Sequence, residues 1–215
     1  MLKLDVLNRI QREGIVAIMR ADRADGLLRA ADAIRAGGVT LIEVTMTTPG
    51  ALEVIREARQ QLSAEVCIGV GSVLDAETAR LAILAGAQFI VTPVLDLDVI
   101  RMSRRYSIPL IMGCYTPSEV KLAWEHGADL IKLFPISQGG ADYLKALRAP
   151  LPQIAFVPTG GIDLENAASY LRAGAFALGV GSSLVSEALL AANDLNELTR
   201  RARAFRAIVD GERGV

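Results

Sequence analysis

The sequence predicts a single α/β domain over residues 1–215, folded as a (β/α)8 TIM barrel with an N-terminal helix. Two observations predict this fold. Short runs of apolar, β-prone residues alternate eight times with Ala- and Leu-rich segments of helical periodicity. The units follow one another at nearly constant spacing, without a linker or a low-complexity segment. Strands that alternate with helices pair in parallel through right-handed crossovers, and eight such units are the number found in a closed barrel.

An N-terminal helix and three strand–helix units are expected first. Leu4, Leu7 and Ile10 recur at helical spacing, so a short amphipathic helix is expected over residues 3–13. The next strands are expected at 15–19, 40–44 and 66–70, and the helices after them at 22–36, 49–62 and 75–85. Glycine follows the first and third of these helices, as is common at helix C-termini.

Five further units complete the series. Strands are expected at 88–92, 109–112, 130–134, 154–157 and 175–180. Helices are expected at 95–105, 116–126, 140–148, 164–173 and, after a short loop or helix, 194–210. A doubly wound open sheet shows the same alternation and is the structural alternative. No G-x-G-x-x-G fingerprint follows the first strand, which argues against the dinucleotide-binding form of that alternative.

The composition fits a compact domain with neither a nucleic-acid nor a membrane partner. Hydrophobic residues make up 52% of the chain and charged residues 22%, which is enough for a sizeable core. The formal net charge is −1, from 23 basic and 24 acidic residues mixed along the chain, so no general field attracts nucleic acid or an anionic membrane. The first residues lack the apolar core of a signal peptide, and no apolar run is long enough to cross a membrane. We therefore expect a cytoplasmic protein.

Metal and disulfide chemistry are not expected. Cys67 and Cys114 lie in apolar surroundings, which favours packed thiols in a reducing compartment. No cluster of His, Cys and Asp has the spacing of metal ligands. The sequence thus predicts neither a metal site nor a bound cofactor.

A lysine inside an apolar strand is the most informative feature of the chain. Side chains alternate across a strand, so Lys132 shares a face with Leu130 and Phe134 in the run A-D-L-I-K-L-F-P (128–135). Both faces of a covered parallel sheet are dry. Burial lowers the pKa of a lysine and makes its amine a nucleophile toward carbonyl groups near neutral pH. The simpler alternative is a lysine that reaches solvent or pairs with Asp129.

A carboxylate occupies a similar place in the second expected strand. Glu43 shares a face with Leu41 and Thr45 in the run L-I-E-V-T (41–45). Barrel enzymes carry their chemistry at the C-terminal ends of the strands, and both Glu43 and Lys132 lie there. An amine and an acid inside the same core indicate a catalytic pair, with a structural ion pair as the alternative.

Two glycine-rich loops follow the last two strands. They read P-T-G-G (158–161) after the seventh strand and G-V-G-S-S (179–183) at the eighth. Barrels commonly bind phosphate at these loops, because glycine lets backbone N–H groups approach an anion closely. Either loop alone is explained as a tight turn, but the two together predict an anion site.

These motifs, in this order, resemble the class I 2-keto-3-deoxy-6-phosphogluconate (KDPG) and 4-hydroxy-2-oxoglutarate (KHG) aldolase family over nearly the whole chain. The resemblance depends on G-G-V (37–39) leading to I-E-V-T (42–45), and on G-V-G-S-V-L (69–74), I-K-L-F-P (131–135) and P-T-G-G-I (158–162). Each motif is weak alone, and together they are specific.

The resemblance implies a role for each candidate site residue. Lys132 matches the lysine that forms a Schiff base with the keto carbon of pyruvate, and Glu43 matches the general acid/base. The substrate-binding positions that it implies are Arg20, Thr47, Ser72, Pro93, Phe134, Thr159, Gly160, Gly161, Gly181 and Ser182. Arg20, Ser72 and Pro93 match positions around the pyruvate carboxylate and the reacting carbons. Phe134 matches the aromatic wall beside the lysine. Gly160, Gly161, Gly181 and Ser182 match the phosphate pocket, with Thr159 at its edge.

The implied activity is that of a carbon–carbon lyase. Such an enzyme cleaves a 2-keto-3-deoxy sugar acid, here KDPG, to pyruvate and glyceraldehyde 3-phosphate without a metal or other cofactor. The resemblance also implies a homotrimer and a place in carbohydrate metabolism, in the Entner–Doudoroff pathway. Two alternatives from other classes stay open: an isomerase or phosphoribosyl-type transferase that uses Lys132 as an electrostatic clamp, and a non-catalytic sugar-phosphate binder.

Two positions depart from the usual family pattern. The run after the glutamate usually reads E-V-T, an apolar residue, then R-T, but this chain has Thr47 at the arginine position. The loss of a bidentate guanidinium leaves the stereochemistry of the substrate open. Galactonate-type relatives also lack that arginine, so KHG and 2-keto-3-deoxy-6-phosphogalactonate are alternative substrates. Ser72 replaces the more usual threonine and keeps its hydroxyl.

Overall fold

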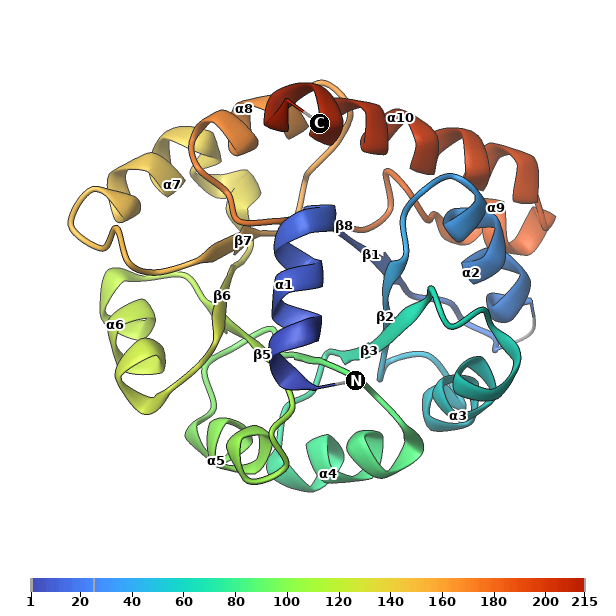
Figure 1. Ribbon diagram of the computed structural model, residues 1–215, viewed down its shortest axis with the longest axis horizontal. Coiled ribbons are helices and arrows are strands. Elements are labelled where there is room, and N and C mark those ends of the chain that lie inside the picture. The colour runs from blue at the N-terminus through green and yellow to red at the C-terminus, as the bar shows by residue number, and fades with distance from the viewer. Residues whose placement is uncertain (1, 25, 215) are drawn as a thin grey trace.

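A computed structural model describes residues 2–24 and 26–214 of the chain (Figure 1). Residues 1 and 215 of the predicted domain, and residue 25 within the predicted helix 22–36, lie outside the described residues. Eight parallel strands form one sheet in the order β7-β6-β5-β4-β3-β2-β1-β8. A parallel bridge between Thr159 and Gly179 joins the two ends of this series, so the sheet closes on itself. The predicted barrel is therefore confirmed.

The strands of the barrel are short, as is usual when a sheet closes around a packed interior. Their bounds are β1 Ile15–Met19, β2 Leu41–Thr45, β3 Cys67–Gly71, β4 Ile90–Val91, β5 Leu110–Cys114, β6 Leu130–Leu133, β7 Phe156–Pro158 and β8 Leu178–Val180.

Helices surround these strands, and one further helix lies across the end of the barrel (Figure 1). Their bounds are α1 Lys3–Glu13, α2 Leu27–Ala36, α3 Ala51–Gln61, α4 Ala76–Ala85, α5 Leu97–Arg105, α6 Pro117–His126, α7 Gly140–Arg148, α8 Ala167–Arg172, α9 Glu187–Ala192 and α10 Leu195–Arg213. A short 3₁₀ helix, η1 Ile136–Gln138, precedes α7. Among the described residues, no helix combines the length and apolar character needed to cross a membrane.

Two helices begin several residues later in the structure than the sequence predicts. The helix predicted from residue 22 begins at Leu27, after Gly26 adopts a left-handed φ of 82°. The helix predicted from residue 164 begins at Ala167, because Asp163 and Asn166 bond to each other's backbone and form a turn instead. Polar residues at a helix start often divert the backbone in this way. Both turns lie at the end of the barrel where the strands finish.

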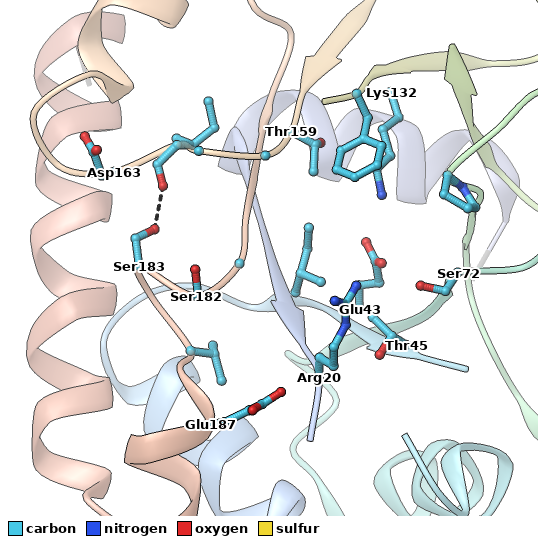
Figure 2. A pocket seen from close by; sticks show the side chains of 18 residues that line it. Arg20, Glu43, Thr45, Ser72, Lys132, Thr159, Asp163, Ser182, Ser183 and Glu187 are labelled. Carbon is cyan, nitrogen blue, oxygen red and sulfur yellow. Dashed lines mark hydrogen bonds between the residues drawn. The ribbon is translucent and has the colours of Figure 1, made fainter. Parts of the chain in front are cut away.

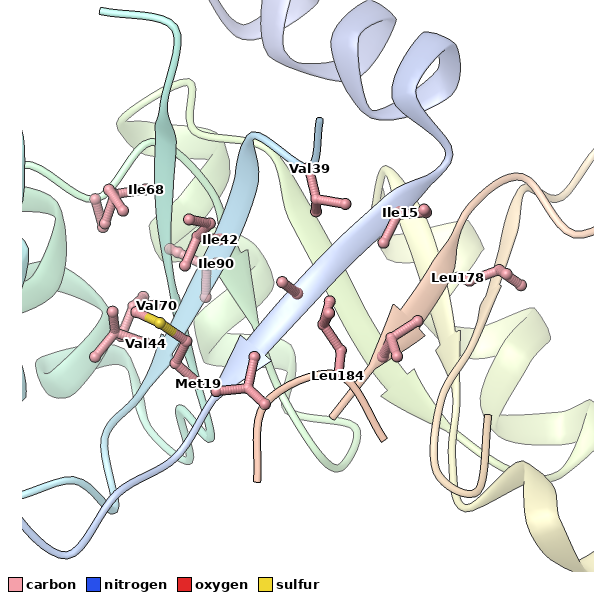
Figure 3. Packing of buried hydrophobic residues seen from close by; sticks show 14 of the residues in the cluster. Ile15, Met19, Val39, Ile42, Val44, Ile68, Val70, Ile90, Leu178 and Leu184 are labelled. Carbon is pink, nitrogen blue, oxygen red and sulfur yellow. The ribbon is translucent and has the colours of Figure 1, made fainter. Parts of the chain in front are cut away.

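The strands separate two apolar layers, as their alternation predicts. Leu130 and Leu41 belong to the cluster inside the barrel, whereas Ile131 and Leu133 pack outward against the helices. Figure 3 shows part of the outer layer, which includes Ile42 and Val44 of β2. Glu43 lies between them in the strand and so faces the other side. Lys132 and Glu43 therefore lie on the inner faces of their strands.

Helix α1 closes the N-terminal end of the barrel (Figure 1). Val6 and Ile10 pack into the interior cluster, and Ile10 is fully buried. Arg213 of α10 donates hydrogen bonds to the carbonyl groups of Gln11 and Phe176, which ties the last turn of α1 to the rest of the chain. Access to the interior is thus left to the opposite end, where the strands finish.

Candidate active site

A cavity of about 700 Å³ opens at the C-terminal ends of the strands (Figure 2). All the predicted site residues except Thr47 line it: Arg20, Glu43, Ser72, Pro93, Lys132, Phe134, Thr159, Gly160, Gly161, Gly181 and Ser182. Its other lining residues are Ile18, Thr45, Ile162, Asp163, Ser183, Val185 and Glu187. The fold thus gathers residues from three strands, β1, β2 and β6, from the loops that follow other strands, and from the start of α9 around one space.

The Lys132 amine and the Glu43 carboxylate point into the same part of this cavity (Figure 2). Lys132 is 6% exposed on β6, and Glu43 is 2% exposed on β2. Within the described part of the chain, neither side chain forms a direct hydrogen bond or ion pair. The two charges therefore interact across the cavity rather than as a closed structural pair, which argues against the purely structural ion pair.

Burial perturbs both groups in the direction that favours their neutral forms. It lowers the pKa of the Lys132 amine, and the negative charge of Glu43 opposes that change only in part. It raises the pKa of the Glu43 carboxyl, with the positive charges of Lys132 and Arg20 acting in the opposite direction. An amine that loses its proton readily and a carboxyl that gains one readily form a suitable pair for proton transfer.

Aromatic and cationic groups border the pair. The ring of Phe134 lies 5.0 Å from the Lys132 Nζ, measured to the ring centroid. The exposed guanidinium of Arg20, at the end of β1, points toward Glu43 from the other side (Figure 2). Its positive charge lowers the pKa of both Lys132 and Glu43. Arg20 can therefore bind a substrate carboxylate, and its charge favours the neutral form of the amine.

The loops after β3 and β4 complete this part of the wall. Ser72 has a φ of 56°, in the left-handed region that serine rarely adopts, and its side chain faces the cavity. Pro93 reaches the cavity because Gly113 on β5 has no side chain. A β-carbon at Gly113 would lie 2.5 Å from the Val94 nitrogen. The Thr92 hydroxyl accepts a hydrogen bond from the Gly113 amide at 2.8 Å, which fixes the two strand ends together.

The other end of the cavity is built from backbone amides. Gly160 and Gly161 have left-handed φ values of 94° and 79°, and the Gly181–Ser182 segment faces them from the end of β8. In the part of the chain that the structure describes, the amide N–H groups of these four residues donate to no protein acceptor. Free amides that converge on a polar cavity are the usual means of holding an anion.

Thr47 lies outside the cavity. It is exposed beyond the end of β2 and contributes to a shallow recess with Pro49 and Gly50. Its hydroxyl lies 3.0 Å from the Thr45 hydroxyl, which does line the cavity. Contact between Thr47 and the substrate therefore stays a prediction. Thr45, rather than Thr47, presents a hydroxyl at the wall of the cavity.

Several lining residues were not among the sequence-based candidates. Thr45 and Ile18 follow from alternation, since each lies two positions from an inward-facing residue. Asp163, Val185 and Glu187 lie in loops or at the start of α9, where no periodic signal exists. Within the described residues, no group of three or more His, Cys, Asp or Glu side chains is arranged to hold a metal ion.

Comparisons with known proteins agree with this geometry. The family model described as KDPG and KHG aldolase matches residues 6–201. A 2-dehydro-3-deoxy-phosphogluconate aldolase of Pseudomonas aeruginosa is 36% identical over 202 residues, covering 94% of this chain and 90% of the relative. A 2-dehydro-3-deoxy-6-phosphogalactonate aldolase of Escherichia coli is 33% identical, covering 89% of this chain and 92% of the relative.

A solved structure adds chemical detail for a relative. The KDPG aldolase of Legionella pneumophila, with pyruvate captured as a covalent carbinolamine intermediate, superposes with a TM-score of 0.86 at 28% identity. The match covers 93% of this chain and 97% of that protein.

Proposed function

Because this chain belongs to the KDPG and KHG aldolase family, we propose that its cavity cleaves KDPG to pyruvate and glyceraldehyde 3-phosphate through a Schiff base on Lys132. One observation carries the proposal. A buried amine with a lowered pKa and a buried carboxyl with a raised pKa face one cavity, whose far end carries unpaired backbone amides.

The first step is attack of the Lys132 Nζ on the C2 carbonyl of the keto acid. The neutral amine supplies the electron pair, and Glu43 in its acid form protonates the oxygen that becomes the carbinolamine hydroxyl. The nitrogen of Lys132 now carries two protons and passes one to the Glu43 carboxylate, which donates it to the hydroxyl. Water leaves, the protonated imine remains, and Glu43 is again a carboxylate. Burial of both groups favours the neutral forms that begin this step.

Cleavage then uses the imine as an electron sink. The Glu43 carboxylate removes the proton of the C4 hydroxyl, the C3–C4 bond breaks, and its electron pair passes into the imine to give a neutral enamine. The aldehyde leaves with the former C4 as its carbonyl carbon. Protonation of the enamine at C3 and hydrolysis of the imine release pyruvate and restore Lys132. The electron balance needs no metal or other cofactor.

Two ends of the cavity orient the substrate. Arg20 and the Ser72 hydroxyl lie beside the Lys132 amine and suit the carboxylate of the pyruvyl half. The amides of Gly160, Gly161 and Gly181 suit a phosphate at the other end. A substrate with an anion at each end would place its reacting carbons near Lys132.

A galactonate epimer or KHG is the second candidate substrate. Thr47 stands outside the cavity and carries no guanidinium, so it lacks the bidentate contact that the arginine of the usual family pattern would supply. A relative named for 2-dehydro-3-deoxy-6-phosphogalactonate is nearly as similar as those named for the gluconate compound. The family supports aldolase chemistry over the isomerase, transferase and binding-protein alternatives.

The deciding experiment is borohydride reduction in the presence of pyruvate, followed by intact mass and peptide mapping. A single reduced pyruvyl adduct on Lys132 is expected. A folded protein without an adduct would reject the Schiff base, and an adduct on another lysine would reject the assignment of Lys132. Turnover of KDPG, its galactonate epimer and KHG then ranks the substrates.

We further propose that the protein assembles as a homotrimer, serves the Entner–Doudoroff pathway and is located in the cytoplasm. Leu81 and Leu84 lie on one face of α4 and are 54% and 63% exposed, and Leu74 and Val94 are exposed on loops beside that helix. Exposed apolar side chains on one surface often mark a subunit contact. Light scattering should give three times the mass of the chain, and Leu81→Glu should lower that mass.

The thiols bear on the location of the protein. Cys67 and Cys114 are free and buried, which fits a reducing compartment such as the cytoplasm.

A further inference from the structure

The two loops at the amide-lined end of the cavity are tied to each other and to their surroundings by side chains. We propose that Ser183 and Asn166 are positioning residues, which hold these loops so that their amides converge on the phosphate of the substrate. The inference rests on the proposed function, since it assigns residues that support the phosphate end of that same site.

Ser183 joins the two loops directly. Its Oγ, after β8, donates a 2.5 Å hydrogen bond to the Ile162 carbonyl, after β7 (Figure 2). The bond connects segments 21 residues apart in the sequence. The β8 loop is itself anchored, because the Arg201 guanidinium on α10 donates to the Ser183 carbonyl at 3.1 Å. The spacing between the loops is thus set by a side chain rather than by the barrel ladder alone.

Asn166 holds the β7 loop from behind. Its Nδ2 donates to the Gly161 carbonyl at 2.7 Å, and its Oδ1 accepts a hydrogen bond from the Asp163 amide at 3.0 Å. Asp163 in turn accepts hydrogen bonds from the amides of Glu165 and Asn166. Asn166 does not line the cavity, so its effect on a ligand is exerted through the peptide groups that it fixes.

These bonds determine where the loop amides point. In a trans peptide the carbonyl and the following N–H point in opposite directions. The Gly161 carbonyl is bound to Asn166, so the Ile162 N–H is directed the other way, and it donates to no acceptor among the described residues. Ile162 also lines the cavity.

The loop needs such support because its own backbone is permissive. Gly160 and Gly161 both adopt left-handed φ values, and glycine populates many alternatives to that conformation. Without the hydrogen bonds from Asn166 and Ser183, the ligand would have to order the loop when it binds. The conformational entropy lost in that step would weaken ligand binding. The expected consequence is weaker binding of the phosphorylated end, without loss of the chemistry at Lys132.

The test measures kcat and KM for KDPG and for its unphosphorylated counterpart, 2-keto-3-deoxygluconate, with the wild-type protein and the variants Ser183→Ala, Ser183→Thr and Asn166→Ala. For KDPG, Ser183→Ala and Asn166→Ala should each raise KM about tenfold, the typical effect of one lost hydrogen bond, with kcat changed less than about twofold. The threonine variant keeps the hydroxyl and should restore KM. Borohydride trapping of pyruvate should proceed as in the wild type.

Ser103→Ala is the matched control, since the Ser103 hydroxyl donates to the Ile100 carbonyl within α5, far from the cavity. It should leave both KM values unchanged. If the wild-type protein binds the two keto acids equally well, the proposed phosphate end is wrong. If the wild-type protein prefers KDPG and Ser183→Ala keeps that preference, the positioning roles are wrong. If Ser183→Ala or Asn166→Ala lowers kcat/KM equally for both keto acids and also reduces trapping of pyruvate, the defect is a general structural one. That result would also reject the inference.

Discussion

Gly71 leaves the space that the Glu43 carboxylate occupies. The two residues lie on neighbouring strands, β3 and β2, and Glu43 lines the cavity. A β-carbon built at Gly71 would overlap the Glu43 Oε1. The φ of Gly71 lies outside the left-handed region, so the glycine is required for space rather than for backbone conformation. The G-V-G motif of β3 thus serves the acid on the adjacent strand.

Gly71→Ala should therefore impair catalysis by displacing the Glu43 carboxylate. We expect a loss in kcat comparable with that of removing a general acid/base, about 10²–10⁴-fold. Steady-state kinetics with KDPG, alongside circular dichroism, measures this. A folded Gly71→Ala protein with wild-type kcat would show that the position of the carboxylate is not critical.

Lys132→Ala should abolish turnover and the borohydride-trapped adduct. The amine is the proposed nucleophile, and no other group can replace its covalent role. Burial penalises the charged form of this lysine, so its loss should leave the fold intact by circular dichroism and thermal melting. Lys145→Ala, which removes an exposed lysine of α7, is the control and should retain both activities. Residual cleavage near the wild-type rate would refute the assignment.

Glu43→Gln should slow turnover by roughly 10²–10⁴-fold while keeping the shape of the side chain. It should also change the pH dependence. The negative charge of Glu43 raises the pKa of Lys132, so its removal lowers that pKa further. Trapping of pyruvate slows at acidic pH as the Lys132 amine is protonated. This acid limb of the pH–rate profile should consequently move to lower pH. A profile that stays in place would mean that the two groups are not electrostatically coupled.

Arg20→Gln should move the same limb in the opposite direction. The positive charge of Arg20 lowers the pKa of both Lys132 and Glu43, so its removal raises both. The amine then holds its proton to higher pH, and trapping at a given acidic pH becomes slower. Rates measured at saturating pyruvate separate this shift from weaker carboxylate binding. A shift to lower pH would contradict the proposed electrostatics.

Gly181→Ala should weaken binding of phosphorylated substrates without destabilising the protein. A β-carbon at Gly181 would have no neighbour within 4 Å among the described residues, because it would project into the cavity itself. KM for KDPG should rise about tenfold or more, as expected when a ligand loses a hydrogen bond or its space.

Gly211→Ala offers a matched control for that substitution. Gly211 lies within α10 and also has open space at its α-carbon. Alanine there should leave KM unchanged and raise stability by about 0.5–1 kcal/mol, because glycine is unfavourable in a helix. Similar KM values for the two variants would place the phosphate elsewhere.

The sequence by itself determined the repeating units, the barrel and the two inward-facing charges. This was possible because strand alternation is local: Leu130 and Lys132 must share a face, as must Leu41 and Glu43, whatever lies around them. The glycine-rich loops were likewise visible as local signals after the last two strands.

Only the tertiary structure decided how these pieces meet. Closure between β7 and β8 brings the Gly160–Gly161 and Gly181–Ser182 segments into one cavity. Pairing of β2 with β3 brings Gly71 against the Glu43 side chain. The tertiary structure also leaves Thr47 outside the cavity and brings Glu187 of α9 to the cavity wall. Loop paths and contacts between neighbouring strands depend on the closed barrel, so no periodicity within a single segment of the chain encodes them.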